Sequence, residues 1–523
     1  MSHQDLSADY VIVGSGAAGS LLSRRLSRRN SVILLEAGPY EDENKDILNS
    51  ELAPELEEKF GTELFWQLGE TVPQEHVNNR TFHYGGGRLV GGSTSINGEQ
   101  YVRPTQTKIT EWQQLLHDSD YSPDNFNRIF KKLETYLGLT QNPEARGKHG
   151  PLSIRQTPQP GTGLGERFAN AITLTTGIQK TIDYNDPCTP LSTFSQWQLY
   201  QKPNGSRASG SVSFLDPIIR PVGNDIYRGT KKHDLVLYTR ATVLRILFKD
   251  GKAKGVSVLI NGIEHVVRGK TIILAAGILS PIILLRSGVG PASDLKKLGI
   301  PVVVDNENVG KNLLNQTLLF LSGTSNPNDV GIPDTDTNTL YCGGALIPDP
   351  LVGGNRRGYQ LIGLSPSPGA FNPIVIPLAS TTAGEIKLYS SDPLTNPQIN
   401  FNYLSTPEDL ASLKAAVRLT NRILQNFGDP AYQLTSPTPE ELADDDQLTE
   451  FIKNNLDQNH HWVGSVKMAP KFQGGVVDSS GRVYGVRNLL VADASVIPTS
   501  PDGNTSASVY AFASIIADKL LDR

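Results

Sequence analysis

The stretch DYVIVGSGAAGSLLSRRL, close to the start of the chain, constrains the fold more than any other feature. An apolar run at Tyr10–Val13 turns into a helical pattern, and a second apolar run follows at Val32–Leu35. The turn holds three glycines with the spacing GxGxxG, namely Gly14, Gly16 and Gly19. Glu36 ends the second run, 22 residues after the first glycine. This strand, helix and strand with a correctly spaced acid predict a dinucleotide site.

Each glycine of the turn has a separate physical reason. Gly14 permits the tight turn, Gly16 lets backbone N–H groups approach a pyrophosphate, and Gly19 permits close packing of helix on strand. The helix N-terminus favours the anion. Glu36 would accept hydrogen bonds from ribose hydroxyls, which suits a dinucleotide without a 2′-phosphate. The motif alone leaves NAD and FAD open.

Composition excludes several classes of protein. A chain of 523 residues exceeds the size of one hydrophobic core, so two domains are expected. The net charge of -5 argues against a nucleic-acid surface. No apolar run approaches roughly 18 residues, so no membrane span is expected. The start of the chain lacks a charged and then apolar signal region, which favours a cytoplasmic protein.

Cysteine usage is sparse. Cys188 and Cys342 are the two cysteines, too few for a zinc cluster or a disulfide framework. We expect free thiols, with a single bridge left open, and we predict no metal site. The oligomeric state stays open.

The rest of the chain alternates strands, loops and helices. Short alternating runs between 233 and 276 predict antiparallel strands that return to a buried strand at Thr271–Ala275. Residues 322–360 have weak periodicity and predict long loops, and residues 384–404 predict two strands. Thr406 predicts a helix cap with Pro407 at the first helical position. The chain closes with a strand and a helix.

The order of these segments favours FAD. An NAD domain usually continues as further βαβ units, whereas this chain passes into a Gly-rich loop at 85–97 and returns to the nucleotide domain at its C-terminus. We expect a mixed α/β and α+β fold, with a Rossmann-like FAD-binding domain at 1–155, 230–310 and 456–523. A substrate-binding domain, built on an antiparallel sheet with helices, is interleaved at 156–229 and 311–455.

Several long segments carry a resemblance to one family. They are GRLVGGSTSINGEQY at 87–101, ILSPIILLRSGVGP at 278–291 and VVDSSGRVYGVRNLLVADASVIP at 476–498. Together they resemble the glucose–methanol–choline (GMC) family of FAD-dependent oxidoreductases. The resemblance runs with gaps from Asp9 to Leu521. It implies oxidation of a small-molecule alcohol, with oxygen or another electron acceptor reoxidising the flavin.

The resemblance also implies catalytic residues. The family carries His-x-x-Gly-Thr near its C-terminus, and here His461 begins the stretch HWVGS. His461 therefore resembles the catalytic base, and Asn504 the second residue that the family places before the last helix. Asn459 lies where some relatives have an asparagine near the active site. His460 has no family role, and a place in the pocket wall is its expected position.

Cofactor contacts carry over by position in the same way. Glu36 resembles the ribose ligand, Asp493 the acid near the pyrophosphate and ribityl chain, and the Val243 backbone the adenine contact. A helix-cap carboxylate is the other interpretation of Asp493. The remaining predicted FAD-binding residues lie in the same motifs: Gly14, Ser15, Gly16, Ala17, Ala18, Gly19, Ala37, Trp66, Val90, Gly91, Gly92, Ser93, Asn97, Gly98 and Thr505. Ile96 stands where some members attach the flavin through a histidine, so non-covalent FAD is predicted.

The implied chemistry removes a hydroxyl proton and a hydride from one carbon. A neutral imidazole with a pKa near the working pH suits the proton, and FAD N5 takes the hydride. Hydroxynitrile lyases and fatty-acid photodecarboxylases share this fold and remain alternatives, as does a flavin-binding protein without activity. No sequence feature selects the lyase or the photodecarboxylase, and the presence of both His461 and Asn504 argues against a flavin-binding protein without activity.

Overall fold

The computed structural model describes residues 6–49, 56–158, 163–329, 341–379 and 382–522. Strand β1 (Leu6–Val13), helix α1 (Ala17–Leu26) and strand β2 (Val32–Leu35) form where the glycine motif predicts them. β1 and β2 pair in parallel, as a βαβ crossover requires. The predicted apolar face of α1 is buried, with Leu21, Leu22 and Leu26 fully covered.

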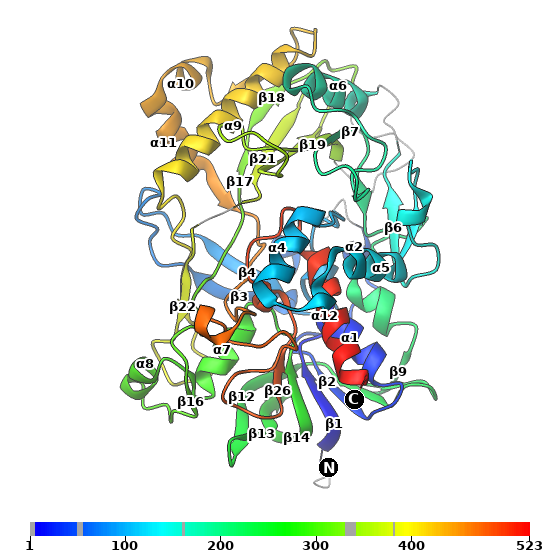
Figure 1. The fold of residues 1–523 in the computed structure, drawn as a ribbon, viewed down its shortest axis with the longest axis vertical. Helices are drawn as coiled ribbons and strands as arrows, with labels where there is room; N and C mark the ends of the chain where they lie inside the picture. Colours follow the sequence, from blue (N-terminus) through cyan, green and yellow to red (C-terminus); the bar gives the residue numbers. More distant parts are fainter. Residues whose placement is uncertain (1–5, 50–55, 159–162, 330–340, 380–381, 523) are drawn as a thin grey trace.

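In the described part of the chain, β1 lies near the middle of a nine-stranded sheet (Figure 1). The strands follow the order β12 (Ala241–Lys249), β13 (Lys252–Ile260), β14 (Ile263–Leu274), β1, β2, β11 (Leu235–Tyr238), β10 (Ile226–Gly229) and β9 (Ile219–Gly223), and β26 (Leu489–Val491) pairs with β14. The pairs β14–β1, β1–β2, β2–β11 and β14–β26 are parallel. The carboxyl ends of β1, β14 and β26 therefore meet at one edge, where doubly wound sheets bind ligands.

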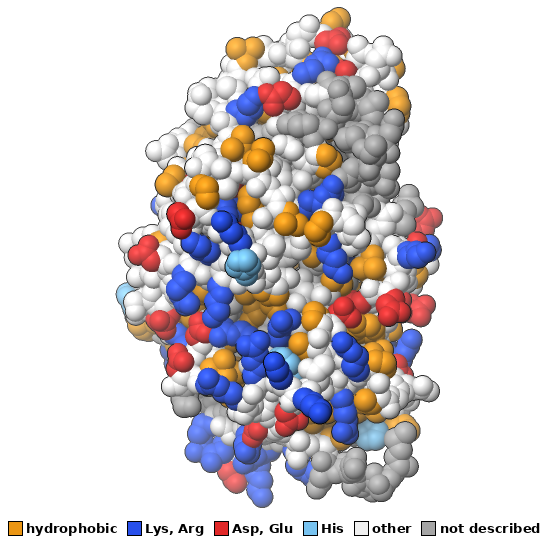
Figure 2. Space-filling model, turned by 90° about the vertical axis from the view of Figure 1, so that its right-hand side faces the viewer, with side chains coloured by type: hydrophobic (Ala, Val, Ile, Leu, Met, Phe, Trp, Pro, Cys, Tyr) orange, Lys and Arg blue, Asp and Glu red, His pale blue; other side chains and the backbone are white. Residues whose placement is uncertain are grey.

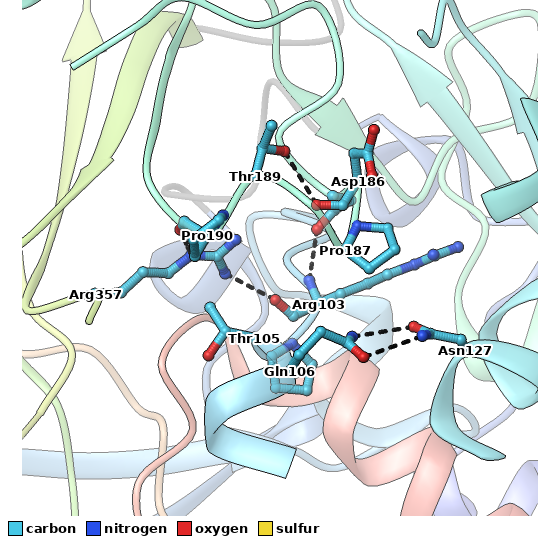
Figure 3. Close-up of a pocket in the computed structure, with 11 residues that line it drawn as sticks. Arg103, Thr105, Gln106, Asn127, Asp186, Pro187, Thr189, Pro190 and Arg357 are labelled. Carbon is cyan, nitrogen blue, oxygen red and sulfur yellow. Dashed lines mark hydrogen bonds between the residues drawn. The ribbon is translucent and has the colours of Figure 1, made fainter. Parts of the chain in front are cut away.

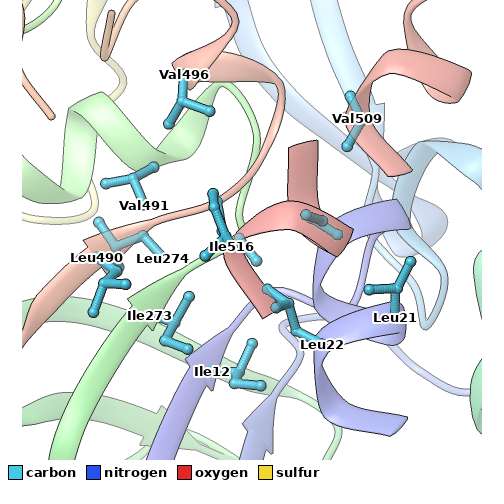
Figure 4. Packing of buried hydrophobic residues seen from close by; sticks show 14 of the residues in the cluster. Ile12, Leu21, Leu22, Ile273, Leu274, Leu490, Val491, Val496, Val509 and Ile516 are labelled. Atoms are coloured by element: carbon cyan, nitrogen blue, oxygen red, sulfur yellow. The ribbon is translucent and has the colours of Figure 1, made fainter. Parts of the chain in front are cut away.

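The sheet packs against two helices distant in sequence. α1 lies beside the C-terminal helix α12 (Thr505–Leu521), and both cover one face of the sheet (Figure 1). Figure 4 shows Ile12, Ile273 and Leu490 of three parallel strands packed toward Leu22 of α1 and Ile516 of α12. All five side chains are buried, so the two ends of the chain share one apolar core.

A second sheet forms the other half of the molecule. Among the described residues it has six strands, in the order β25 (Leu456–Gln458), β17 (Thr317–Phe320), β21 (Asn372–Pro377), β20 (Tyr359–Leu364), β19 (Tyr341–Ile347) and β7 (Ser192–Phe194). Its pairs are antiparallel. Helices α6 (Leu164–Thr176) and α9 (Pro407–Gln425) pack beside it (Figure 1). This is the antiparallel sheet with helices that the sequence predicts.

Shorter elements connect the two halves. The helices are α2 (Lys45–Leu48), α3 (Leu56–Leu64), α4 (Gln106–Leu116), α5 (Pro123–Leu133), α7 (Leu279–Arg286), α8 (Ala292–Lys297), α10 (Pro439–Ala443) and α11 (Asp445–Asn455). The short sheets pair β3 (Phe65–Glu70) with β4 (His83–Gly87), β5 (Glu134–Leu137) with β6 (Leu152–Gln156) and β8 (Gln198–Leu199), β15 (Val289–Gly290) with β16 (Val304–Asp305), β18 (Ser322–Thr324) with β24 (Gln433–Ser436), and β22 (Glu385–Lys387) with β23 (Gln398–Asn400).

The prediction of loops across 322–360 is wrong for three segments. β18, β19 and β20 are strands, and β19 lies between two partners in the six-stranded sheet. Gly343 and Gly344 interrupt the apolar pattern of β19, and the register shifts between Tyr341 and Gly344. A Cβ on Gly344 would lie 2.5 Å from the Leu361 carbonyl oxygen. The glycines thus allow close strand contact and a bulge, and long-range pairing outweighs the weak local pattern. Residues 330–340 lie outside the described residues.

Strand pairing crosses the boundaries of the predicted domain ranges at two places, and the ranges themselves stay a prediction. β9 and β10, within the range 156–229 assigned to the substrate domain, extend the nine-stranded sheet because β10 pairs with β11. β25, at the start of the range 456–523 assigned to the FAD domain, pairs with β17 of the six-stranded sheet.

The predicted helix start at Thr406 is confirmed, although its side chain makes no capping hydrogen bond.

The surface carries mixed charge. On the face in Figure 2, Lys and Arg side chains gather across the middle, with Asp and Glu side chains around them. Exposed pairs such as Lys131 with Glu144, at 3.4 Å, contribute little to stability.

Both cysteines are free, Cys188 exposed and Cys342 buried. Within the described residues, no helix combines the length and the apolar character needed to cross a membrane.

Candidate active site

The glycine loop connects β1 to α1 and faces open space. A Cβ on Gly16 would meet no atom within 4 Å, whereas one on Gly19 would lie 1.9 Å from the Gly14 carbonyl oxygen. Gly19 is thus required for packing, and Gly16 leaves room for a ligand. Gly16 precedes the first turn of α1, which holds Ala17 and Ala18, and no described side chain caps this end. Its free N–H groups suit an anion.

Glu36 lies beside this loop. Its Oε2 accepts hydrogen bonds from the backbone N–H and the hydroxyl of Ser15, at 2.9 and 2.6 Å, and its Oε1 accepts one from the Gly38 N–H at 3.1 Å. The Ala37 N–H also acts on this carboxylate, so local donors hold Glu36 in place beside the glycine loop. The Glu36 carbonyl accepts from the Ala241 N–H at 2.8 Å. This bond places the start of β12, and with it Val243, next to Glu36.

The Gly-rich segment 90–98 packs on the glycine loop. The Gly91 N–H donates to the Ser15 carbonyl at 3.2 Å, and a Cβ on Gly92 would lie 2.9 Å from the Gly16 Cα. The segment includes the buried Val90 and a 3₁₀ turn, η2 (Gly92–Ser95), which contains Ser93. The Arg207 guanidinium donates to the backbone carbonyl and the side-chain oxygen of Asn97 at 2.6 and 3.0 Å. Two predicted FAD segments therefore form one cradle.

Asp493 is buried where the parallel strands end. Its Oδ2 accepts from the Gly277 N–H at 3.0 Å and the Ser280 hydroxyl at 2.5 Å, and its Oδ1 accepts from the Ser495 N–H at 2.9 Å. Burial raises the pKa of Asp493. The carboxylate caps the 3₁₀ turn η7 (Ala494–Val496) and holds the loop before α7. The capping interpretation is confirmed, and direct contact with FAD stays a prediction.

The arrangement fits a dinucleotide. The cradle combines an open glycine, an uncapped helix N-terminus, a buried acid, and a second Gly-rich segment against the first. Four further residues are predicted FAD contacts: Trp66 on β3, Ala37 after β2, Gly98 after η2 and Thr505 at the start of α12. Trp66 carries the Arg88 guanidinium 5.2 Å from its ring centre.

His461 is held by backbone pairing between two distant segments. Leu314 and Val463 exchange two backbone hydrogen bonds of 3.0 Å, and the Asn459 N–H donates to the Gln316 carbonyl at 2.9 Å. These bonds continue the antiparallel pairing of β17 with β25. The His461 N–H donates to the Asn315 side chain at 2.9 Å. Between these two pairs, residues 460–462 lie opposite the single residue Asn315, and His460 has a left-handed φ of 54° that breaks the strand.

The imidazole of His461 is surrounded by amides. Its Nδ1 lies 2.6 Å from Gln316 Oε1 and 2.9 Å from Asn459 Nδ2, and its Nε2 lies 3.5 Å from Asn504 Nδ2. Asn504 is the N-cap residue of α12, but its side chain caps no N–H group. It instead donates from Nδ2 to Gln100 Oε1 at 3.1 Å, and Gln360 donates to the same oxygen at 2.9 Å.

Burial lowers the pKa of His461 to about 3, with a smaller effect of the same sign from His460. The prediction of a pKa near the working pH is therefore wrong in the direction of a weaker base. The imidazole is neutral at neutral pH and has a lone pair for a proton. Burial is the main cause of this difference, and the side chains that contact the ring are amides, which carry no charge that would raise the pKa.

His460 lies apart from this group. Its ring packs edge-on against Trp462, with ring centres 5.4 Å apart, and its side chain is exposed. Desolvation by the residues around it lowers the pKa of His460, and the charges of Asp457 and Glu57 act in the opposite direction. The two neighbouring imidazoles therefore have different surroundings, and His460 lies in a left-handed conformation rather than in an extended stretch.

Comparison with known proteins identifies the family of the chain. Residues 8–318 and 380–513 match the N-terminal and C-terminal parts of the GMC oxidoreductase family. The chain belongs to the GMC oxidoreductase family. An oxygen-dependent choline dehydrogenase of Staphylococcus saprophyticus subsp. saprophyticus is 30% identical over 98% of this chain and 94% of its own length. The protein is thus an FAD-dependent oxidoreductase.

Solved structures share the fold of this GMC oxidoreductase. Pyridoxine 4-oxidase from Mesorbium loti superposes with a TM-score of 0.84 at 23% identity, covering 98% of this chain and 99% of its own. A fungal aryl-alcohol oxidase superposes with a TM-score of 0.82 at 19% identity, covering 99% and 100%. At these identities the likeness establishes the fold alone.

Sequence reasoning missed the three glutamines of this GMC oxidoreductase site. Gln100, Gln316 and Gln360 are all buried. Gln316 and its neighbour Asn315 interrupt the apolar run NLLNQTLLF, and adjacent amides inside such a run are the signal that could have found them. Gln100 and Gln360 carry no comparable local signal, because the side-chain contact that joins them connects segments distant in the sequence.

A small cavity of about 10 Å³ lies between the halves of this GMC oxidoreductase (Figure 3). Arg357 lines it and donates to backbone carbonyls of Pro190 and Arg103 at 2.6 and 2.8 Å. It also donates to the Asp502 carbonyl at 3.4 Å, two residues before Asn504. The volume suffices for roughly one water molecule. Arg357 therefore anchors backbone segments rather than a substrate.

Proposed function

We propose that this GMC oxidoreductase oxidises an alcohol to the carbonyl compound, with His461 as the proton acceptor. The observation that carries the proposal is a neutral imidazole whose Nε2 lies 3.5 Å from the amide nitrogen of Asn504. A hydroxyl oxygen within hydrogen-bond reach of both nitrogens would give its proton to Nε2 and receive a hydrogen bond from Asn504 Nδ2. The amide stabilises the developing alkoxide and does not compete as a base.

The residues of the cradle would hold FAD at the glycine loop, Glu36 and the 90–98 segment. When bound, FAD supplies the acceptor for the hydride that leaves the same carbon. His461 takes the proton, and Gln316 and Asn459 hold its other ring nitrogen. Asn504 is held in turn by Gln100. The polar groups are thus fixed before substrate arrives, which is how an enzyme limits reorganisation during the reaction.

FAD is proposed to be bound without a covalent link. Ile96 offers no nucleophile, and His83, the nearest upstream histidine, lies 3.3 Å from the Glu57 carboxylate on an exposed surface. Acid precipitation of the yellow protein should leave the colour in the supernatant. Colour retained in the pellet would contradict this proposal and point to His83 or a tyrosine.

The function is tested by anaerobic mixing of the purified flavoprotein with a panel of alcohols. The names of the relatives suggest including choline, pyridoxine and aryl alcohols. Bleaching of the flavin absorbance by at least one alcohol, with the carbonyl product recovered, is the expected result. The His461→Ala variant is the control and should bleach far more slowly. An unbleached flavin with cyanohydrin cleavage, or with light-dependent release of CO₂, would instead assign one of the alternative activities.

A further inference from the structure

Gln316 has the most constrained side chain near His461. It is 0% exposed, and its Nε2 faces four oxygens from two segments. These are the carbonyls of Leu378 at 3.4 Å, Pro501 at 2.9 Å and Gly503 at 3.3 Å, and the hydroxyl of Ser500 at 3.3 Å. The Ser500 hydroxyl donates to the Leu378 carbonyl at 3.0 Å, so it accepts from Gln316. A nitrogen among four acceptors fixes the orientation of the amide.

This orientation decides which nitrogen of His461 carries the proton. Gln316 Oε1 points at His461 Nδ1 at 2.6 Å and can only accept. Asn459 Nδ2, at 2.9 Å from the same nitrogen, can only donate. Nδ1 cannot satisfy both. The Asn459 side chain has no other hydrogen-bond partner among the described residues, so its amide is free to turn and present its oxygen. Gln316 therefore determines that Nδ1 carries the proton, because its own amide cannot turn.

We propose that Gln316 is the positioning residue that fixes His461 as the tautomer with the proton on Nδ1, leaving the lone pair on Nε2 beside Asn504. The same amide group holds the 500–503 loop, from which Asn504 follows directly. One buried side chain thus positions both catalytic residues. The catalytic meaning of this inference rests on the proposed function, whereas the tautomer itself does not.

The tautomer matters because only one nitrogen faces Asn504. The hydroxyl proton of the substrate goes to Nε2, and the proton on Nδ1 stays in place, so the product of the step is an imidazolium. Gln316 Oε1 accepts from Nδ1–H before and after the transfer and stabilises the charge that forms. In the described part of the chain, His460 is the titratable group that acts on His461. The groups that approach the ring from other elements, Gln316 and Asn504, are amides.

The first test reads the tautomer directly and needs no substrate. The flavoprotein is labelled with ¹⁵N-histidine, and the His461 signals are assigned by their absence in His461→Gln. At neutral pH, Nδ1 should show the shift of a protonated ring nitrogen and Nε2 that of an unprotonated one. Asn459→Ala is the matched control and should keep this pattern. A proton on Nε2 in the wild-type protein, or a reversed pattern in Asn459→Ala, would overturn the proposal.

The second test changes the charge at the same position. Gln316→Glu places a carboxylate against Nδ1, and an opposite charge at this distance raises the pKa of an imidazole by roughly 1–3 units. The rate of anaerobic flavin reduction should be independent of pH between 5 and 8 in the wild-type enzyme. In Gln316→Glu it should fall on the acid side, with an inflection shifted upward by about that amount. Flavin content and thermal unfolding are recorded for the variant.

The outcomes of the second test separate two failures. A folded Gln316→Glu enzyme with flavin content and pH profile equal to the wild type would show that Gln316 does not act on the imidazole. If the variant does not fold, the labelled wild-type protein and Asn459→Ala still decide the proposal. If no alcohol reduces the wild-type flavin, the proposed function fails, and the ring-nitrogen shifts decide the tautomer independently.

Discussion

Two buried polar clusters in this enzyme are built from different chemistry. Near the Arg357 cavity, charged side chains pair directly: Glu134 Oε1 lies 2.7 Å from Arg103 and 3.2 Å from Arg146, and Arg146 lies 3.3 Å from Asp183. We call these four residues the ionic cluster. Around His461, the partners are the uncharged amides of Gln100, Gln316, Gln360, Asn459 and Asn504, which we call the amide cluster.

The difference follows from what each cluster has to do. Buried charges of opposite sign compensate one another and fix the geometry of the segments that carry them. A reacting imidazole needs the opposite condition, because a nearby carboxylate would raise its pKa and protonate it before substrate arrives. Amides orient the ring with dipoles and leave it neutral. We therefore expect the ionic cluster to serve the framework, and we propose that the amide cluster serves the reaction.

The largest expected effect breaks the ionic cluster. Glu134→Gln keeps the shape of the side chain but leaves Arg103 and Arg146 buried with one carboxylate fewer. Removing one partner of a buried ion pair costs about 3–5 kcal/mol of unfolding free energy. Chemical denaturation should show that loss, while flavin reduction per bound flavin stays close to the wild-type rate. A variant as stable as the wild type would show that these charges do not hold the framework.

The next effect breaks the amide cluster at its centre. His461→Ala removes the proton acceptor but touches none of the cradle segments, so flavin content should persist. Stopped-flow reduction of the flavin by the best alcohol should slow by roughly 10²–10⁴-fold, the usual contribution of a positioned base. Unfolding free energy is the control and should change less than in Glu134→Gln. Reduction at the wild-type rate would remove His461 from the mechanism.

The comparison also explains what the sequence could reveal. Gly14, Gly16, Gly19 and Glu36 act within one local βαβ unit, so their spacing alone predicts a site that the structure brings together. The proposed catalytic pair needed more than spacing, and only the family resemblance of the HWVGS stretch distinguished His461 from His460. The elements of the nine-stranded sheet were predictable where the apolar periodicity was strong.

The amide partners could not be predicted, for a physical reason. Gln316 reaches His461 because β17 pairs with β25, and Gln360 reaches Gln100 from β20, in a segment whose glycines and prolines favour loops. Such pairings join residues more than a hundred positions apart and leave no local pattern. The low pKa of His461 was missed for the same reason, since it depends on burial among uncharged partners.

A smaller effect is expected from the second catalytic residue. Asn504→Ala removes the donor to the reacting oxygen and leaves the proton acceptor in place. One hydrogen bond to a developing charge corresponds to about 10–100-fold in rate. Stopped-flow reduction should therefore slow by less than in His461→Ala, with flavin content unchanged. A slower rate than that of His461→Ala would reverse the assigned importance of the two residues.

The smallest effect separates the two neighbouring imidazoles. His460 packs on Trp462 at 5.4 Å between ring centres and makes no hydrogen bond to the amide cluster among the described residues. His460→Ala removes this contact, and it also removes the minor influence that lowers the pKa of His461. Because the imidazole of His461 is already neutral at neutral pH, reduction there should change by less than about 3-fold, well under the acid–base contribution. If His460→Ala proved slower than His461→Ala with equal flavin content, the proton acceptor would be His460, and the left-handed turn at that residue would present the base rather than set it aside.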